Sequence, residues 1–183
     1  MKRAELIHLL QAAAEIVDED EFVIVGSQAV LGNPGVLPEA LLLSMEADIY
    51  PLRVPDRAIE IDGALGEGSP FRELYGYWAH GVGPETPWAP TGWQSRLIPL
   101  ELPGFHTSRQ RTITGWCLSA ADLVLSKLAA GRAKDIEFVG EALRAGIVNA
   151  DQLELGLELM EVRHRERTAA NLRIVLARRG TQP

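Results

Sequence analysis

Two acidic side chains have the spacing that lets a protein hold a divalent cation. Glu46 and Asp48 lie two residues apart in the segment Glu46 to Leu52, whose alternation predicts a β-strand. Side chains at positions i and i+2 of a strand share one face, and Ser44 joins them if the strand begins that early. Two like charges repel unless water or a cation lies between them. The pair therefore fits either a Mg²⁺ or Mn²⁺ site with room for phosphates, or the solvent-facing edge of a half-buried strand.

A glycine-serine pair closes the first predicted strand. Gly26 and Ser27 follow the run Phe22 to Val25, which has the β-branched and aromatic residues of a buried strand. A helix that begins here would present free N–H groups and a hydroxyl at its positive end, where phosphate binds. The same residues fit a plain strand-to-helix turn with a serine cap. The segment has neither the Gly-Lys-Ser/Thr of a P-loop nor the GxGxxG pattern of a dinucleotide site.

A basic cluster lies in the segment from Asp122 to Asp135. Lys127, Arg132 and Lys134 gather there around a predicted small-residue kink at Ala129-Ala130-Gly131. In a chain of net charge −7, such a cluster offers a local site for a triphosphate, or an exposed helix face with internal ion pairs.

Predicted helices and strands position these groups in an α/β chain. Apolar spacing predicts an amphipathic helix over 3–17, ahead of the first strand. One or two helices are expected over 55–75, an ordered loop over 77–92 flanked by short strands, and a hairpin of strands 96–102 and 111–118 joined across Pro103-Gly104. Ser119 has the pattern of a helix cap, and helices follow at about 120–130, 132–145, 150–161 and 163–178. We therefore predict an α/β core at 1–118 and a helical part at 119–183.

Composition narrows the class of protein. The 183 residues include 18 basic and 25 acidic side chains, which argues against a protein that coats nucleic acid. The single cysteine cannot form an internal disulfide, no run is apolar enough to span a membrane, and acids interrupt the apolar N-terminal segment, so we expect a cytoplasmic protein. His8 and His164 are expected on solvated helix faces, and His80 fits a cleft residue or a structural histidine. The tryptophans near the central loop fit core packing or base stacking; they are Trp78, Trp88, Trp93 and Trp116.

The order of these motifs resembles a known family. Gly-Ser after the first strand, Ser-x-Glu-x-Asp on the second, and Asp-Leu-x-x-x-Lys-Leu-x-Ala-x-Arg-x-Lys-Asp later are similar to the minimal nucleotidyltransferases of the abortive-infection AbiEii type, nearest to a small bacterial branch of unknown function. The loop Tyr77-x-x-His80-Gly-Val-Gly-Pro-Glu-Thr86 and the segment Gly92-Trp93-x-x-Arg96-Leu97 are also similar. The resemblance covers residues 20–145, and implies a nucleotidyltransferase-like mixed sheet flanked by helices with a helical C-terminal extension.

The resemblance also implies a role for each matching residue. It implies that Glu46 and Asp48 are catalytic metal ligands and that Lys127 and Asp135 belong to the catalytic set. The nucleotide-binding residues it implies are Gly26, Ser27, Ser44, Lys127 and Arg132. The implied cofactor is Mg²⁺ or Mn²⁺, and the implied substrate is a nucleoside triphosphate.

The sequence departs from the family pattern in two places. Glu46 stands where the first carboxylate is usually Asp, and in a second register Asp48 takes that place and Tyr50 falls where the second acid belongs. The third carboxylate of many nucleotidyltransferases has Glu101 as its candidate.

Two functions stay open. One is transfer of a nucleotidyl group to tRNA or to a protein hydroxyl, in a toxin–antitoxin pair with a cognate antitoxin as partner. The other is a catalytically degenerate fold that acts as a binding or antitoxin-like module.

Overall fold

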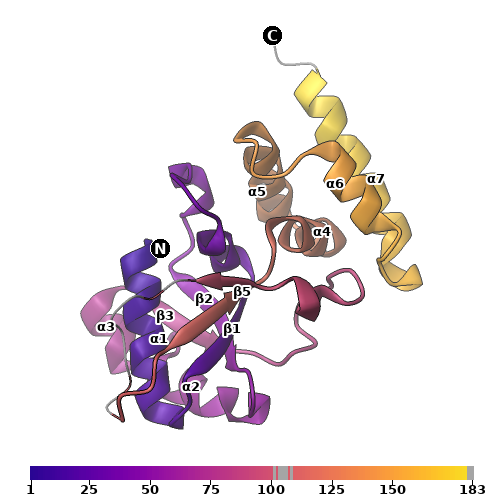
Figure 1. Cartoon of the computed structure of the whole chain (residues 1–183). Coiled ribbons are helices and arrows are strands. Elements are labelled where there is room, and N and C mark those ends of the chain that lie inside the picture. Colours follow the sequence, from indigo (N-terminus) through magenta and orange to yellow (C-terminus); the bar gives the residue numbers. More distant parts are fainter. Residues whose placement is uncertain (101, 103–106, 108, 181–183) are drawn as a thin grey trace.

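A five-stranded mixed sheet forms the centre of the protein, with the strand order β3-β2-β1-β5-β4 (Figure 1). The computed structural model describes residues 1–100, 102, 107 and 109–180. The strands are β1 (Glu21–Val25), β2 (Glu46–Pro51), β3 (Trp78–Gly81), β4 (Ile98–Leu100) and β5 (Thr114–Cys117). β1 is antiparallel to β2 and parallel to β5, β2 is parallel to β3, and β4 is antiparallel to β5. The mixed sheet with flanking helices confirms the predicted fold class.

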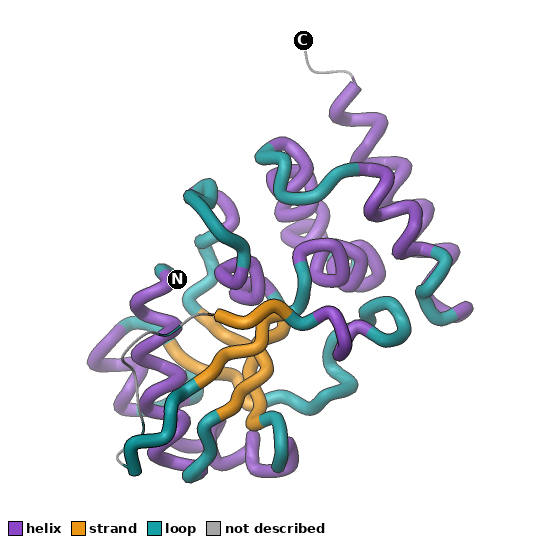
Figure 2. Tube along the Cα trace, viewed as in Figure 1, coloured by secondary structure: helices purple, strands orange, loops and turns teal. Residues whose placement is uncertain are grey.

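Helices surround the sheet in two groups. The α-helices are α1 (Arg3–Val17), α2 (Ala58–Leu65), α3 (Pro70–Tyr75), α4 (Ala120–Ala130), α5 (Ala133–Arg144), α6 (Ala150–Leu157) and α7 (Val162–Gly180). Figures 1 and 2 show α1 to α3 beside the sheet and α4 to α7 gathered beyond one end of it. At that end β1 and β5 finish and β2 begins, because β2 runs antiparallel to β1. Loops and helix ends therefore meet the start of β2 there.

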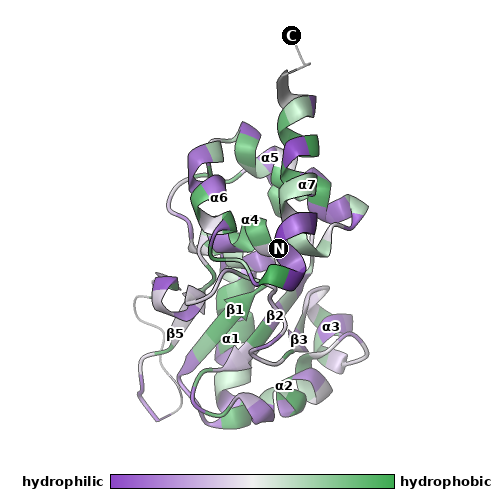
Figure 3. Cartoon of the chain, turned by 90° about the vertical axis from the view of Figure 1, so that its right-hand side faces the viewer, coloured by the Kyte–Doolittle hydropathy of each residue, from purple (hydrophilic) through white to green (hydrophobic). Residues whose placement is uncertain are grey.

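The core follows the apolar pattern of the sequence. Phe22 to Val25 of β1 are fully buried, since α1 packs beside the sheet with Leu6, Leu9 and Leu10 on its buried face. Burying each such side chain contributes about 1.5–3 kcal/mol to folding. The hydropathy colouring of Figure 3 shows β1 as a hydrophobic strand at the centre of the sheet. The predicted helix over 3–17 and the predicted first strand are confirmed.

Two local expectations need correction. The segment after Gly26 is a short 3₁₀ helix, η1 (Ser27–Gly32), and not the start of an α-helix. The helix predicted from Ser119 to about Ala130 is confirmed, but the predicted kink at Ala129-Ala130-Gly131 is a complete break, because Gly131 takes a left-handed conformation (φ 65°) and α5 begins afresh at Ala133. A side chain at Gly131 would also come within 2.6 Å of Asn171 on α7.

The remaining elements agree with the sequence in outline. β4 and β5 pair as an antiparallel hairpin, with Ile98 opposite Cys117, while the expected connection at Pro103-Gly104 lies outside the described residues. The division into 1–118 and 119–183 stays a prediction. None of the described helices combines the length and apolar character that crossing a bilayer requires.

Candidate functional site

The two acidic residues of β2 converge with a histidine of β3. One ligand atom each from Glu46, Asp48 and His80 lie within 4.8 Å of one another. Asp48 pairs with Val25 on one side and with His80 on the other, so it occupies the middle of three neighbouring strands. The shared face predicted from the i, i+2 spacing is confirmed for the two carboxylates.

The ionised form of Asp48 is disfavoured in this position. Burial raises the pKa of Asp48, and the negative charge of Glu46 raises it further, while the hydrogen bond from His80 and the charge of Lys127 act in the opposite direction. A divalent cation beside the pair would remove this penalty by neutralising both charges.

Tyr50 does not complete the acidic pair. Its side chain is only 4% exposed, and burial, with the charge of Glu85, raises the pKa of the phenol to about 12. A phenol that stays protonated is a poor cation ligand. The placement favours the register in which Glu46 and Asp48 are the paired acids.

Sequence reasoning gave His80 too little weight. Its Nδ1 lies 3.0 Å from Asp48 Oδ1 and 4.0 Å from Glu46 Oε1, and 53% of its side chain is exposed. The sequence feature that could have placed His80 beside Asp48 is the alternation of a β-strand. That feature is weak here, because β3 is only four residues long and lies within a segment rich in glycine and proline. Pairing with β2 could not be read from so short a run.

Gly26 brings the turn after β1 against the carboxylate of Asp48. Its backbone has φ 60° and ψ −162°, a conformation that is essentially restricted to glycine. A Cβ at Gly26 would lie 1.9 Å from Asp48 Oδ2, so a side chain there would collide with the acid. Ser27 follows at the same turn, and its Oγ accepts a hydrogen bond from Lys127 Nζ at 2.9 Å.

Lys127 reaches this turn from α4. The side chain is only 9% exposed, and Nζ also donates to Asp135 Oδ1 at 3.2 Å and lies 4.5 Å from the centre of the Phe138 ring. Burial lowers the pKa of Lys127, and the neighbouring carboxylate of Asp135 offsets part of that shift. The ammonium is therefore poorly hydrated, and it lies beside Ser27 while paired with Asp135.

Asp135 lies behind the basic side chains. It is fully buried, and Arg132 Nε donates to its Oδ2 at 2.6 Å. Burial acts to raise the pKa of Asp135, but the hydrogen bond from Arg132 and the charges of Lys127 and Arg132 outweigh burial and lower it. Asp135 thus stays ionised and fixes two cations, without access of its own to a ligand.

Ser44 shapes the start of β2. Its Oγ donates to the carbonyl of Glu46 at 3.1 Å and accepts from the Glu46 amide at 3.2 Å. The Ser44 carbonyl in turn accepts a hydrogen bond from Gln28 Nε2 at 2.7 Å. These bonds fix the backbone on which Glu46 stands.

Most of these groups line one cavity, which we call the carboxylate cleft. Its volume is about 430 Å³, and it is lined both by acidic side chains and by a group of basic side chains, Lys127, Arg132 and Lys134, which we call the basic wall. The charged and polar residues that line it are Ser27, Ser44, Glu46, Asp48, His80, Thr86, Ser126, Lys127, Arg132 and Lys134. Of the residues predicted from the sequence, Asp135 does not line the cleft, and Glu101 lies outside the described residues.

A tryptophan stands at the same cleft. Trp88 lines it and is 41% exposed, and its ring stacks on His164 with centroids 4.5 Å apart and planes 14° from parallel. Trp93, by contrast, is buried in the core. The expectation that His164 is simply solvated is therefore wrong. His8 is also not solvated, because its Nδ1 lies 2.6 Å from the hydroxyl of Tyr77, just before β3, and its ring packs edge-on against Tyr75 of α3.

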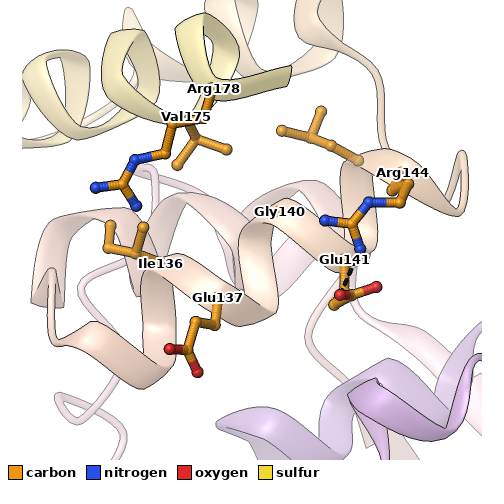
Figure 4. A pocket seen from close by; sticks show the side chains of 8 residues that line it. Ile136, Glu137, Gly140, Glu141, Arg144, Val175 and Arg178 are labelled. Carbon is orange, nitrogen blue, oxygen red and sulfur yellow. Dashed lines mark ion pairs between the residues drawn. The ribbon is translucent and has the colours of Figure 1, made fainter. Parts of the chain in front are cut away.

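A separate hollow lies between α5 and α7 (Figure 4). Its volume is about 230 Å³, and Glu141 and Arg144 form an ion pair at its edge. The figure shows Val175 and Arg178 of α7 facing Ile136 across it. None of the residues predicted for the site lines this hollow.

Comparison with known proteins identifies the family of this chain. A family model described as "Nucleotidyltransferase of unknown function (DUF6036)" matches residues 4–177. No curated protein and no solved structure matches the chain. Because the match spans nearly the whole sequence, the chain belongs to this family of nucleotidyltransferases.

Proposed function

We propose that this protein is a metal-dependent nucleotidyltransferase of the AbiEii-like kind, which moves a nucleotidyl group from a nucleoside triphosphate to an acceptor. One observation carries the proposal. The carboxylates of Glu46 and Asp48 and the cations of Lys127, Arg132 and Lys134 line one cleft. Such a cleft suits a ligand that brings both a metal ion and several phosphates.

The acidic pair fits a divalent cation by its chemistry and its charge. Glu46 and Asp48 offer carboxylate oxygens, the donors that Mg²⁺ and Mn²⁺ prefer, and the burial that raises the pKa of Asp48 leaves a charge in need of a counter-ion. When bound, Mg²⁺ or Mn²⁺ supplies neutralisation of the phosphate charge that grows during transfer.

The basic wall provides the phosphate contacts. Lys127 presents a poorly hydrated ammonium beside the Ser27 hydroxyl, and Arg132, with 63% of its side chain exposed, offers a planar fork to phosphate oxygens. Asp135 acts as a positioning residue, because it holds both cations in place from a buried site. Gly26 lines the cleft without a side chain, so nothing at this position collides with Asp48.

The acceptor has a route to the same groups. A further cavity of about 570 Å³, which we call the acidic hollow, shares Glu46 and His80 with the cleft and is lined by Asp62, Glu67 and Ser69. Carboxylates repel the phosphates of RNA, so the acidic hollow favours a protein hydroxyl over tRNA as acceptor. A toxin–antitoxin role, with a cognate antitoxin that covers the cleft, belongs to the same proposal.

Calorimetry separates this function from the alternative of a degenerate binding module. Titration of each nucleoside triphosphate, with and without Mg²⁺ or Mn²⁺, is expected to show binding that needs the metal. Transfer of label from the α-phosphate to protein or to tRNA then identifies the acceptor. Metal-independent binding with no transfer would favour the module, and absence of all nucleotide binding would contradict the proposal.

A further inference from the structure

His80 is the third side chain of the acidic cluster. It lies directly opposite Asp48 in the parallel pairing of β2 and β3, so the sheet itself sets their separation. Its Nδ1 is the ring atom that faces the cluster, 3.0 Å from Asp48 Oδ1 and 4.0 Å from Glu46 Oε1. The side chains of Glu46 and His80 are 40% and 53% exposed, which leaves both free to rotate by small amounts.

These separations suit three ligands of one small cation. With ligand atoms about 2.1 Å from an octahedral ion, neighbouring ligands lie about 3.0 Å apart and opposite ones about 4.2 Å apart. The two distances from Nδ1, 3.0 and 4.0 Å, fall within this range, and small rotations of the exposed Glu46 and His80 side chains would bring the whole cluster, now within 4.8 Å, into it. Water, phosphate and acceptor oxygens would complete the coordination shell.

A nitrogen donor changes which ion the site holds best. Carboxylate and water oxygens suit Mg²⁺ and Mn²⁺, whereas imidazole suits first-row transition ions and is a poor partner for Mg²⁺. Mn²⁺ accepts both kinds of donor. Among the described residues the cluster has no third carboxylate that could take the place of the imidazole.

We propose that His80 Nδ1 is a direct metal ligand alongside Glu46 and Asp48, the ion replacing the hydrogen bond to Asp48 while the ring proton lies on Nε2, and that it makes the site select Mn²⁺ over Mg²⁺. The inference rests on the proposed function for its metal site and adds a ligand and a preferred ion to it. It places His80 in the role that the sequence left to Glu101.

Electron paramagnetic resonance on the full chain tests the ligand without any activity measurement. Titration with Mn²⁺ alone gives its Kd from the signal of the free ion, and competition with Mg²⁺ gives the ratio of the two affinities. Electron spin echo modulation then detects an imidazole nitrogen bound to Mn²⁺. His80→Ala and His80→Asp are compared with Glu67→Gln, a control in the acidic hollow that lies outside the cluster.

We expect nitrogen modulation in the wild type and in Glu67→Gln, and none in either His80 variant. His80→Ala is expected to raise the Kd for Mn²⁺ by at least about tenfold, since losing even an outer-shell partner costs 10- to 100-fold. His80→Asp should keep Mn²⁺ binding through a new oxygen ligand, while the preference for Mn²⁺ over Mg²⁺ falls severalfold. Circular dichroism checks that each variant is folded.

Two results would overturn the inference. Bound Mn²⁺ that disappears in Asp48→Asn, yet shows no nitrogen modulation and no response to His80→Ala, would exclude His80 as a ligand and leave the proposed function standing. Failure of the wild type to bind Mn²⁺, even with a non-hydrolysable nucleoside triphosphate present, would overturn the inference and the proposed function together.

Discussion

Asp48 is the residue at which function and stability are expected to oppose each other. Because burial raises its pKa in the folded state, stability falls as the pH rises from the ordinary pKa of an aspartate through that raised value, and the loss is complete above it. Asp48→Asn keeps the shape and removes the charge, so without metal its melting temperature should equal or slightly exceed that of the wild type at neutral pH. The difference should close at pH values below the ordinary pKa of an aspartate, where both states are protonated.

The same substitution should abolish metal-dependent nucleotide binding. Differential scanning calorimetry from acid to neutral pH measures the first effect, and isothermal titration with nucleotide and metal measures the second. A large fall in the melting temperature of the metal-free variant would show instead that the hydrogen bond between Asp48 and His80 is mainly structural.

Substitutions of Lys127 are expected to weaken nucleotide binding to different degrees while the protein stays folded. Lys127→Ala should weaken triphosphate binding strongly, since it removes the buried cation next to Ser27. Asp135 keeps its bond from Arg132, so the fold should survive with a loss of about 1–3 kcal/mol in the free energy of unfolding. Lys127→Arg should restore only part of the affinity, because a planar fork does not take the place of a compact ammonium.

Urea unfolding and nucleotide titration of both variants check this expectation. If neither variant changes nucleotide affinity beyond error, Lys127 serves only to cover core side chains with its stem, and the functional interpretation fails.

At the scale of elements, the turn between β1 and η1 lies directly against the carboxylate of Asp48. Gly26→Ala should lower the free energy of unfolding by more than about 1–3 kcal/mol, because its φ and ψ are strained for alanine and the new methyl meets Asp48. Metal affinity should fall as the carboxylate is displaced. Gly63→Ala is the matched control: Gly63 lies in α2 with no atom within 4 Å of an added Cβ, so stability should hold or rise.

Chemical denaturation and Mn²⁺ titration of the two glycine variants give the comparison. Equal stability of the two variants would contradict the steric role of Gly26.

Elements with a strong local pattern could be predicted from the sequence. Neighbouring residues alone specify the buried run of β1 and the alternation of β2. The same holds for the cap at Ser119, whose Oγ accepts a hydrogen bond from the Asp122 amide. The position of β3 is not, since its pairing with β2 depends on contacts across 32 residues. The stacking of His164 on Trp88 likewise depends on how α7 docks, which no local pattern specifies.

At the scale of the whole molecule, the candidate site exists only because distant parts of the chain meet. The bond from Lys127 to Ser27 joins residues 100 positions apart. α7 supports the end of α4 that carries Lys127, since Asn171 Nδ2 donates to the Leu128 carbonyl at 2.8 Å and Arg167 donates to that of Ala130. The order of motifs in the sequence was enough to predict which residues belong to the site. The burial of Asp135 behind Lys127 and Arg132 depends on the break at Gly131, which turns α5 relative to α4.

The distribution of charge over the molecule leads to the last prediction. The chain has a net charge of −7, so a triphosphate is repelled at long range and attracted only where Lys127, Arg132 and Lys134 gather. Nucleotide affinity should therefore fall as salt rises from about 0.05 to 0.5 M, because screening weakens exposed charges most. Lys134→Gln, at an exposed rim position, should reduce affinity at low salt and flatten the salt dependence. Arg53→Gln should leave both unchanged, because Arg53 pairs with acids at the other end of β2. Binding that ignores salt, or two variants that behave alike, would show that the basic wall does not face the phosphates.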